Sequence, residues 1–409
     1  VDGTKLDGIE SNATADQTSS EIVALIADQT IAPSTIDMED NEKILLGTGD
    51  DLQFYHDGND TYLYQDGTGE LKVNTATFRV MDRNGGETQL LATENGAVEL
   101  YFNNSKKLET TSTGAKVTGA ITGTADATIN SVNIGKGANS VTENTVLGAN
   151  ALDADVSGGA LTAVGFNALT NCTSGGSNTA IGRRTLEFVT TGQSNTAVGA
   201  KALNKNTSSS NTAVGLAALS ENTTGTNNVA VGANALDANT TGNNNTAVGG
   251  FALTAITTGT ENTAVGYDSL SECTDAVQCV AVGAYALETN SSADRCVAIG
   301  YKALEANQAS DLVAIGRFAC LKNTTGIRNT AIGRNSLEQN QTGNDNTAVG
   351  YNCLEENTGS NNTAIGASAL VVNTTASNNT GVGLEALTTN TTGHSNTSVG
   401  SQSLQLNTT

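Results

Sequence analysis

Few side chains in this 409-residue sequence have the types and spacing that acid–base or nucleophilic chemistry requires. The two histidines, His56 and His394, are far apart in sequence and belong to no recognisable metal or nucleophile motif. The acidic groups Asp37–Asp40 and Asp50–Asp51 have carboxylates that could hold a cation, but neither has the spacing of a calcium-binding loop. A solvated acidic surface is the favoured interpretation. We expect no catalytic residue, no metal site and no cofactor, and we do not expect an enzyme.

Aromatic and arginine side chains are the best candidates for a binding surface. They recur one or two residues after a regularly spaced glycine, as at Phe166, Arg183, Tyr267, Tyr301 and Tyr351. Binding surfaces enrich these residue types, so one interpretation is contact with another molecule. The alternative, which we favour, is that these side chains cover seams between chains of an oligomer.

The element that must position these side chains is a repeat, and its glycine recurs sixteen times at a spacing of 17 or 16 residues. The glycines are Gly148, Gly165, Gly182, Gly199, Gly215, Gly232, Gly249, Gly266, Gly283, Gly300, Gly316, Gly333, Gly350, Gly366, Gly383 and Gly400. Gly135 is a candidate degenerate copy before them. We number each copy from its glycine, so that position −1 precedes the glycine and position +1 follows it.

Residues before the glycine alternate with period two, which predicts a strand. Position −1 is aliphatic, −2 is small, −3 is Thr or Val, and −4 is Asn in 12 of the 16 copies. A small residue at +3 and Leu at +4 suggest a second short strand. Residues such as Asn239-Thr240-Thr241-Gly242 then supply turn chemistry. Each copy is expected to form a strand, a kink at the glycine, a second strand and a turn.

Two asparagine positions are predicted to point inward and to stack as amide ladders. At −4 the substitutes for Asn are Leu161, Leu312, Cys279 and Cys296, and at +7 they include Val189 and Ile256. A solvent-facing turn residue rarely gives way to such side chains, although a simple turn-forming role for Asn is the alternative. The expected structural positions are Asn195, Asn211 and Asn245 at −4, Asn206, Asn222, Asn239 and Asn290 at +7, and the backbone-constrained Gly199, Gly232 and Gly266.

One copy cannot bury its own apolar face, whereas stacked copies can, which is the logic of a solenoid. Sixteen rungs at the usual strand spacing give a stack about 77 Å long. Both strand faces carry apolar or small residues, and the chain has no Trp and only 4% aromatic residues. We therefore expect an all-β homotrimeric fibre, in which one face fills the coil and the other meets another chain.

The six cysteines are Cys172, Cys273, Cys279, Cys296, Cys320 and Cys353, and none has zinc-finger spacing. Each takes a repeat position otherwise held by Asn, Leu or Ala. Cys279 and Cys296 occupy the same position of successive copies, so they should be neighbours. A disulfide is possible, but in-register parallel side chains are poorly aimed for one. Buried free thiols are the favoured interpretation.

The pattern Asn-Thr-Ala-Val-Gly-x-x-Ala-Leu, as at 195–203, resembles the repeat of trimeric autotransporter adhesin heads. The resemblance covers residues 144–409 and implies a trimeric left-handed parallel β-roll. The coil here is longer than is typical of that family, and we place the additional residues in the Thr-Thr-Gly turn.

Three further segments precede the repeats. Residues 1–36 contain a capping box, Thr18–Glu21, before Ile22, Leu25 and Ile26, and predict a short helix that three chains would pack as a coiled coil. Residues 37–118 predict β-hairpins, and residues 119–143 predict a connector to the parallel β-roll at 144–409. The hairpin evidence is the turn pairs Asp57-Gly58, Asp66-Gly67, Asn84-Gly85 and Asn95-Gly96, with strands at 52–55, 61–64 and 98–102.

Residues 3–10, 47–58 and 96–110 resemble modules of tailed-phage fibre proteins, particularly those of marine phages. This resemblance covers about a third of the chain and carries no active-site motif. It implies a virion appendage that reaches or adheres to a host cell, with a host-surface glycan or protein as a possible receptor.

Net charge and hydropathy argue against two classes of binding partner. The formal charge of −22 argues against nucleic acid and anionic membrane surfaces. No apolar run is long enough to insert into a membrane. No signal peptide is visible, the first residue is Val, and both ends look cut from a longer polypeptide.

We expect a tail or other appendage fibre of a tailed phage that mediates host-cell attachment. The alternative is the passenger of a bacterial trimeric adhesin on the cell surface. A minor alternative is an ice-binding solenoid, because Thr occupies position −3 in 12 of 16 copies. The Val residues that replace this Thr fit a buried β-branched column better.

Overall fold

The computed structural model describes residues 39–46, 52–65, 68, 70–119, 127–129, 131–137, 141–154 and 157–409. Regular secondary structure in these ranges is entirely β-strand, so the all-β prediction is confirmed for them. The chain divides into two compact units, Val1–Ile121 and Thr122–Thr409. The predicted helix and coiled coil of residues 1–36 lie outside the described residues.

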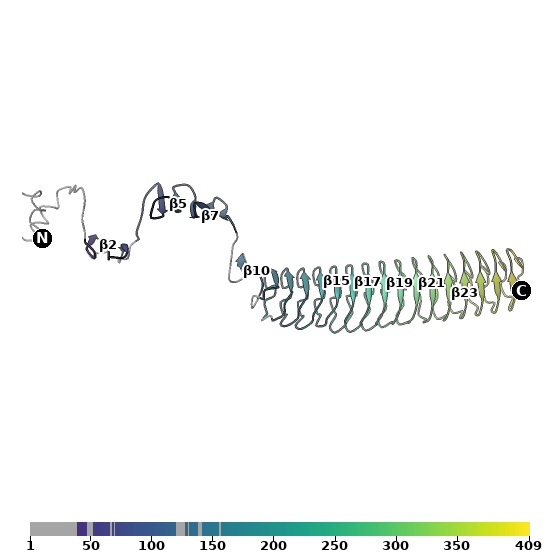
Figure 1. The fold of residues 1–409 in the computed structure, drawn as a ribbon. Helices are drawn as coiled ribbons and strands as arrows, with labels where there is room; N and C mark the ends of the chain where they lie inside the picture. The colour runs from purple at the N-terminus through teal and green to yellow at the C-terminus, as the bar shows by residue number, and fades with distance from the viewer. Residues whose placement is uncertain are drawn as a thin grey trace, which may run out of the picture. The chain divides into compact units, whose positions relative to one another are not determined.

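The first unit contains two antiparallel sheets (Figure 1). One joins β1 (Lys43–Leu46), β2 (Leu52–His56) and β3 (Thr61–Gln65); the other joins β4 (Thr77–Met81), β5 (Thr88–Thr93), β6 (Val98–Phe102), β7 (Ser105–Thr111) and β8 (Gly114–Val117). The three strands predicted at 52–55, 61–64 and 98–102 are therefore present. Gly58, Gly85 and Asn95 have φ of 95°, 68° and 57°, as turn residues in these hairpins.

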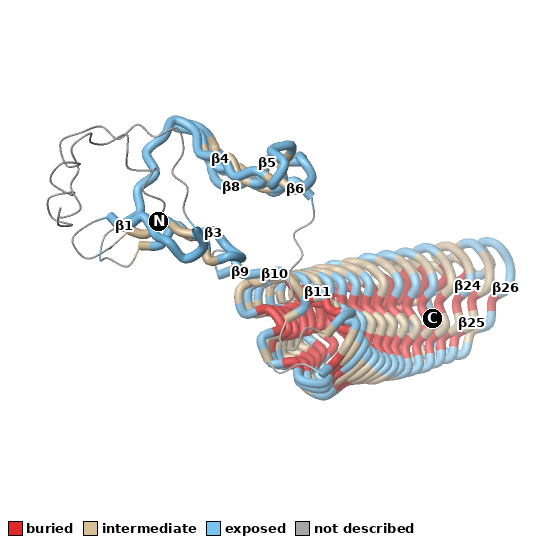
Figure 2. Tube along the Cα trace, turned by 60° about the vertical axis from the view of Figure 1, so that its left-hand side comes forward, coloured by how far each residue is buried: buried red, intermediate tan, exposed pale blue. Residues whose placement is uncertain are grey.

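The five-stranded sheet has one apolar and one charged face. A cross-strand row on one face consists of Val80, Leu90, Leu100, Leu108 and Val117, and the adjacent row, on the other face, consists of Arg79, Leu91, Glu99, Glu109 and Lys116. No described residue between 39 and 119 is buried, and Figure 2 shows only exposed and intermediate colours there. Leu100 and Val117 remain 41% and 40% exposed. The apolar face therefore has no cover within the described part of this chain.

The second unit is a β-solenoid of stacked coils, one strand per coil (Figure 1). Two short strands, β9 (Ala127–Ile129) and β10 (Val132–Gly135), precede the coils. The coil strands are β11 (Thr145–Gly148), β12 (Thr162–Val164), β13 (Thr179–Ile181), β14 (Thr196–Val198), β15 (Thr212–Val214), β16 (Val229–Val231), β17 (Thr246–Val248), β18 (Thr263–Val265), β19 (Val280–Val282), β20 (Val297–Ile299), β21 (Val313–Ile315), β22 (Thr330–Ile332), β23 (Thr347–Val349), β24 (Thr363–Ile365), β25 (Thr380–Val382) and β26 (Thr397–Val399).

Each coil strand pairs in parallel with its counterpart in the next coil, position for position. Thr246 lies opposite Thr263, and Thr196 lies opposite Thr212, although the second spacing is one residue shorter. The turn absorbs the difference, because the segment from Asn206 to Asn211 is one residue shorter than that from Asn222 to Asn228. Coil length therefore varies without any slip in the sheet.

The predicted second strand after the glycine is wrong. The residues at +2 and +4 have positive φ, for example 54° at Asn234 and 53° at Leu236, and they form successive turns. Alternate amides bond in opposite directions: Lys201 N–H donates to the Arg183 carbonyl below, and Leu203 N–H donates to the Ala218 carbonyl above. A series of turns, rather than a second strand, therefore forms the side of the coil that follows the glycine.

Gly135 is not a degenerate first copy. It lies in β10, which pairs antiparallel with β11 and with β9. A parallel rung at that place would have the opposite strand direction. The connector therefore ends as a hairpin that covers the first edge of the parallel sheet, which is one way proteins protect an edge strand.

The interior of the solenoid is narrow and is filled by small residues and one large apolar residue per coil. Ala at −2, Ala or another small residue at +3, and Leu at +4 are fully buried in most coils, as at Ala230, Ala235 and Leu236. Figure 2 shows these positions as continuous buried rows along the stack. Each buried Leu contributes about 1.5–3 kcal/mol, so the core grows in proportion to the number of coils.

Backbone stacks directly on backbone at the repeat glycines. Gly199, Gly232 and Gly266 have φ of 131°, 142° and 142°. A Cβ on Gly232 would lie 2.5 Å from the Gly249 carbonyl carbon, and the corresponding distances at Gly199 and Gly266 are both 2.6 Å. Glycine is therefore required twice over, by backbone conformation and by the approach of the next coil.

We predict that Gly232→Ala loosens the coils locally. The unfavourable φ alone costs about 1–3 kcal/mol, before the next backbone is displaced. Because a solenoid coil couples mainly to its neighbours, hydrogen–deuterium exchange should rise near residues 215–250 and stay unchanged in β4–β8.

Gly250→Ala is the matched control. A Cβ at Gly250 would lie 3.7 Å from the Tyr267 ring, an ordinary contact. Equal exchange patterns for the two variants would contradict the requirement for glycine at position 0.

Candidate functional site

Asparagine side chains at −4 tie each coil to the next through its backbone. Asn211 Oδ1 accepts a hydrogen bond from the Asn228 backbone N–H at 3.0 Å, and Asn211 Nδ2 donates to the Gly225 carbonyl at 2.8 Å. Asn195 and Asn245 make the same two kinds of contact. All three side chains are fully buried. The predicted inward direction is present, but the main partners are backbone groups rather than other amides.

The asparagines at +7 form the amide ladder itself. Asn222 Nδ2 donates to Asn206 Oδ1 at 2.6 Å, and Asn239 Nδ2 donates to Asn222 Oδ1 at 2.7 Å. Asn290 is also buried and bonds the Ala293 backbone, but no amide stands one coil below it, because Cys273 holds that position. The ladder therefore exists in runs. One run ends at Asn239, where Ile256 interrupts the column, and another ends at Asn340, although Asn357 follows it, because Asn357 Nδ2 donates to the Gly359 carbonyl instead.

Asn239 is the last member of one run. Ile256 holds the +7 position of the next coil, and Asn239 Oδ1 has no hydrogen-bond partner. Its Nδ2 carries both bonds, to Asn222 Oδ1 and to the Gly242 carbonyl at 3.1 Å. A negative charge introduced at this side chain would therefore meet few competing hydrogen bonds.

We predict that Asn239→Asp destabilises the solenoid by at least about 1–3 kcal/mol at neutral pH, because it replaces a donor by a buried acceptor that faces two oxygens. Burial should raise the pKa of the new carboxyl group above its unfolded value. The protonated form, which can donate, therefore dominates at acidic pH, and the deficit relative to wild type at the same pH should grow as pH rises. Thermal melts followed by circular dichroism measure both effects.

Asn244→Asp serves as the control for this substitution. Asn244 is exposed and has φ of 58°, a conformation that Asp also tolerates. A wild-type melting curve for Asn239→Asp at every pH would refute the inward amide ladder.

All six cysteines are buried and free. Burial raises the pKa of the Cys273, Cys320 and Cys353 thiols to about 12. Cys279 Sγ donates to the Ala293 carbonyl at 3.2 Å, and Cys296 Sγ donates to the Ala309 carbonyl at 3.3 Å. The thiols therefore substitute for the amide donors of the interior, in agreement with the favoured interpretation.

We predict that native protein does not react with a thiol-specific disulfide reagent at pH 8, whereas six thiols react in guanidinium chloride. The thiolate is the reactive form, and burial with a raised pKa suppresses it. A count below six after unfolding without reductant would indicate a disulfide, with the Cys279–Cys296 pair as the first to examine by mass spectrometry.

The outward face of the solenoid strand carries a β-branched stripe, which we define as the residues at −3 and −1. Val231, Val248 and Ile299 at −1 are 37%, 37% and 38% exposed. Thr246 and Thr263 at −3 are intermediate in exposure. The expectation that the −3 column is buried is therefore wrong for the single chain, because Asn at −4 and Ala at −2 are the residues that face inward.

Aromatic rings at +1 and +2 form a continuous row over five successive coils. We call this row the aromatic ladder: Phe251, Tyr267, Tyr285, Tyr301 and Phe318. Neighbouring ring centroids are 5.7–6.0 Å apart with interplanar angles of 61–88°. Two of the predicted surface residues, Tyr267 and Tyr301, thus belong to one surface.

The other predicted surface residues lie elsewhere on the +1 and +2 edge. Tyr351 is 49% exposed and lies under Arg334, whose guanidinium carbon is 5.7 Å from the ring centroid. Phe166 is 48% exposed and makes no ring contact with the described residues. Arg183 lies on the coil after Phe166 and is exposed.

The histidines do not converge on a site. His56 Nδ1 lies 3.3 Å from Thr61 Oγ1 in the first unit, and His394 Nδ1 accepts the Ser377 backbone N–H at 2.9 Å in the solenoid. Among the described residues, no group of three His, Cys, Asp or Glu side chains is arranged to hold a metal ion. The same residues contain no helix that is long and apolar enough to cross a membrane.

Comparisons with protein-family models, with curated proteins and with solved structures gave no match. Three surfaces of this chain therefore bear on its function: the β-branched stripe, the apolar face of β4–β8 and the aromatic ladder.

Proposed function

We propose that this chain is a structural fibre protein that assembles as a homotrimer and belongs to the tail or another appendage of a tailed phage, where it mediates attachment to a host cell. The observation that carries the proposal is that, among the described residues, nothing covers the long apolar sheet faces of the two units. Exposed apolar faces of this size are expected on a single chain when copies of that chain associate through them.

The first unit supports self-association most directly. A sheet of five strands with no buried residue loses most of the apolar stabilisation that a small β-domain needs. Pairing the row of Val80, Leu100 and Val117 with the same row of other copies would supply that burial. The charged row on the opposite face would remain in solvent.

The β-branched stripe supports the same assembly in the solenoid. Position −1 is Val or Ile in every coil after the first, which has Leu147, so copies aligned in parallel would meet a matching column along the whole stack. Three copies around one axis satisfy a closed symmetry and leave no stripe unpaired. The net charge of −22 per chain disfavours further lateral association of completed fibres.

The assignment to a phage rather than to a bacterial adhesin rests on residues 3–10, 47–58 and 96–110, which resemble phage fibre modules. The last of these segments contains β6 and most of β7. The sequence of the whole gene would discriminate between the two: a C-terminal membrane β-barrel encoded there would indicate an adhesin, and an encoded tip or chaperone domain would indicate a phage fibre. Either protein would act outside a cell.

We predict a solution mass near 124 kDa, three times 41.4 kDa, by light scattering coupled to size exclusion. The triple substitution Val231→Lys, Val248→Lys and Val265→Lys places charges on the β-branched stripe, where burial against another copy is costly. It should lower the mass or make it concentration-dependent.

The triple substitution Thr224→Lys, Thr241→Lys and Thr258→Lys is the control. It adds the same charge at exposed turn positions in the same part of the solenoid. A monomeric wild-type chain at micromolar concentration would refute the homotrimer.

Ice binding remains a second candidate because of one observation, the outward direction of the threonine column at −3. A flat, regular array of Thr and Val on a rigid sheet is available in the single chain. A homotrimer formed through the same face would cover it. This candidate would be favoured over the fibre by three results together. The wild type would show thermal hysteresis, the Val231→Lys triple variant would lose it, and the mass would be that of a monomer.

A further inference from the structure

The aromatic ladder holds its rings in fixed positions on the solenoid surface. Tyr267 and Tyr301 are 48% and 41% exposed, yet each packs edge-to-face against rings of the coils on both sides. Rings held in this way present apolar area with little rotamer freedom left to lose on binding. The backbone beneath them is part of the hydrogen-bonded coil stack, so the platform is rigid.

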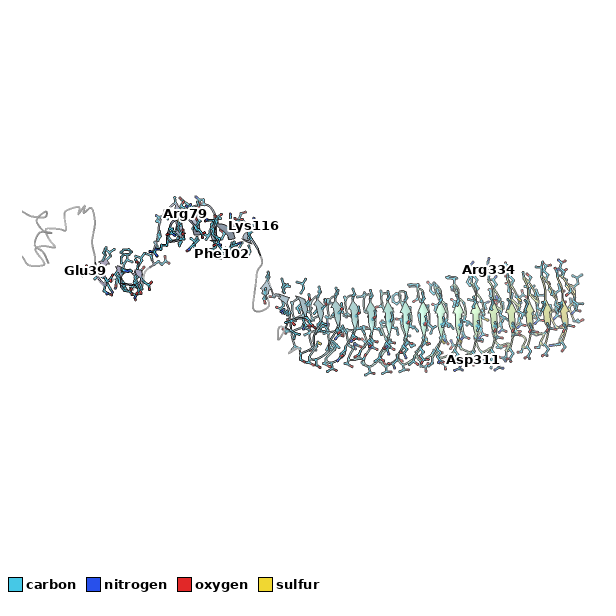
Figure 3. The ribbon with its side chains drawn as sticks, viewed as in Figure 1. Glu39, Arg79, Phe102, Lys116, Asp311 and Arg334 are labelled. Atoms are coloured by element: carbon cyan, nitrogen blue, oxygen red, sulfur yellow. The ribbon has the colours of Figure 1, made fainter. Side chains whose placement is uncertain are left out.

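Positive charge gathers on the same edge. Across the sixteen coils, positions +1 and +2 contain six cations and two acids. Two of the cations are paired with glutamates at position +5, Arg184 with Glu187 and Lys302 with Glu305. The cations are Arg183, Arg184, Lys201, Lys302, Arg317 and Arg334, and the acids are Asp268 and Glu385. Figure 3 shows Arg334 on one long edge of the solenoid and Asp311 on the opposite edge.

Two of these cations are available to a ligand. Arg317 lies over the Phe318 ring at 4.3 Å from its centroid, and Arg334 lies over Tyr351. Neither arginine forms an ion pair with the described residues, in contrast to Arg295 and Arg328, which pair with Asp311 and Asp345 on the next coil. The unpaired cations therefore lie over aromatic rings, half-buried Phe318 and exposed Tyr351, and form no ion pair with carboxylates of the described residues.

We propose that the aromatic ladder and the adjoining Arg317 and Arg334 form a binding surface for an acidic polysaccharide that lies along the solenoid. Sugar rings would stack on the aromatic side chains, and their carboxylate or other anionic groups would pair with the two guanidinium groups, which suit planar anion recognition. This inference rests on the proposed attachment function and names its ligand class.

The repetition of the surface favours a polymer. Rings recur once per coil, at roughly the strand spacing, so a chain of similar sugars meets similar contacts over five coils. Asp268 is the one acid at positions +1 and +2 between Phe251 and Tyr351, and Glu305 at +5 is paired with Lys302. The anionic groups of the ligand are therefore expected over Arg317 and Arg334. A seam between copies is the competing occupant, and it makes a different prediction for the oligomeric state.

The test uses the full chain and two polymers that share a backbone, polygalacturonate and its methyl ester. Binding is followed by tyrosine fluorescence, since the chain has no Trp and Tyr267, Tyr285, Tyr301 and Tyr351 are four of its 8 tyrosines. Retention on the immobilised polymer is the second measurement. Wild type should bind polygalacturonate, and added salt should weaken the binding. The ester should bind about tenfold more weakly or not at all.

Two variants separate the contributions of rings and charges. Tyr285→Ala with Tyr301→Ala should weaken binding about tenfold, as loss of anchoring aromatic side chains does elsewhere. Arg317→Gln with Arg334→Gln should remove the difference between polygalacturonate and its ester. Arg295→Gln with Arg328→Gln, on the opposite edge, is the matched control and should leave binding unchanged.

Each alternative result overturns the proposal in a recognisable way. A trimeric wild type that retains neither polymer removes the binding surface and leaves the fibre assignment intact. Loss of the trimer in the Tyr285→Ala, Tyr301→Ala variant makes the aromatic ladder a seam between copies. Equal binding of polygalacturonate and its ester contradicts the acidic ligand. A monomeric wild type that still binds polygalacturonate refutes the proposed fibre but not the ladder.

Discussion

The approach of backbone to backbone at the repeat glycines is the constraint on which the rest of the solenoid depends. At Gly232 the next coil lies so close that no Cβ fits, and the same holds at Gly199 and Gly266. This contact fixes where each coil sits on the one before it. Once that position is fixed, the residues from −4 to +7 fall opposite their counterparts, and similar side chains form columns along the stack.

The columns explain why asparagine, rather than a larger apolar core, fills much of the interior. An amide can accept a hydrogen bond from one backbone N–H and donate one to a backbone carbonyl at the same time. Asn211 does so with the Asn228 N–H and the Gly225 carbonyl. Leu161 and Leu312 show that an apolar residue fits the same place. The amides therefore contribute alignment between coils as much as burial, while the leucines at +4 supply most of the apolar area.

The sequence predicts the solenoid well because a repeat displays the same structural requirement many times. Invariant glycine, inward asparagine and buried cysteine could all be inferred from which residues replace which. The direction of the −3 and −1 side chains could not, because a period of two separates two faces without saying which one is inside. The structure answers this by placing Ala at −2 in the core.

The missed turns after the glycine had a signal that could have been used. Asn stands at +2 in five coils, Asn150, Asn167, Asn234, Asn335 and Asn352, and Asn tolerates positive φ better than most residues. The aromatic ladder was harder to see, because its rings alternate between +1 and +2. Only the superposition of coils brings Tyr285 and Tyr301 to one row.

The hairpin over the first edge of the parallel sheet has a consequence for how the gene can change. β9 and β10 cover only that edge, and each later coil contacts only its two neighbours. The position of a coil in the stack is therefore not fixed by contacts with distant coils. Unequal recombination between repeats would add or remove whole coils and leave the cap and the first unit as they are. The length of the solenoid can thus change by one coil at a time between generations, while the packing of its interior stays the same.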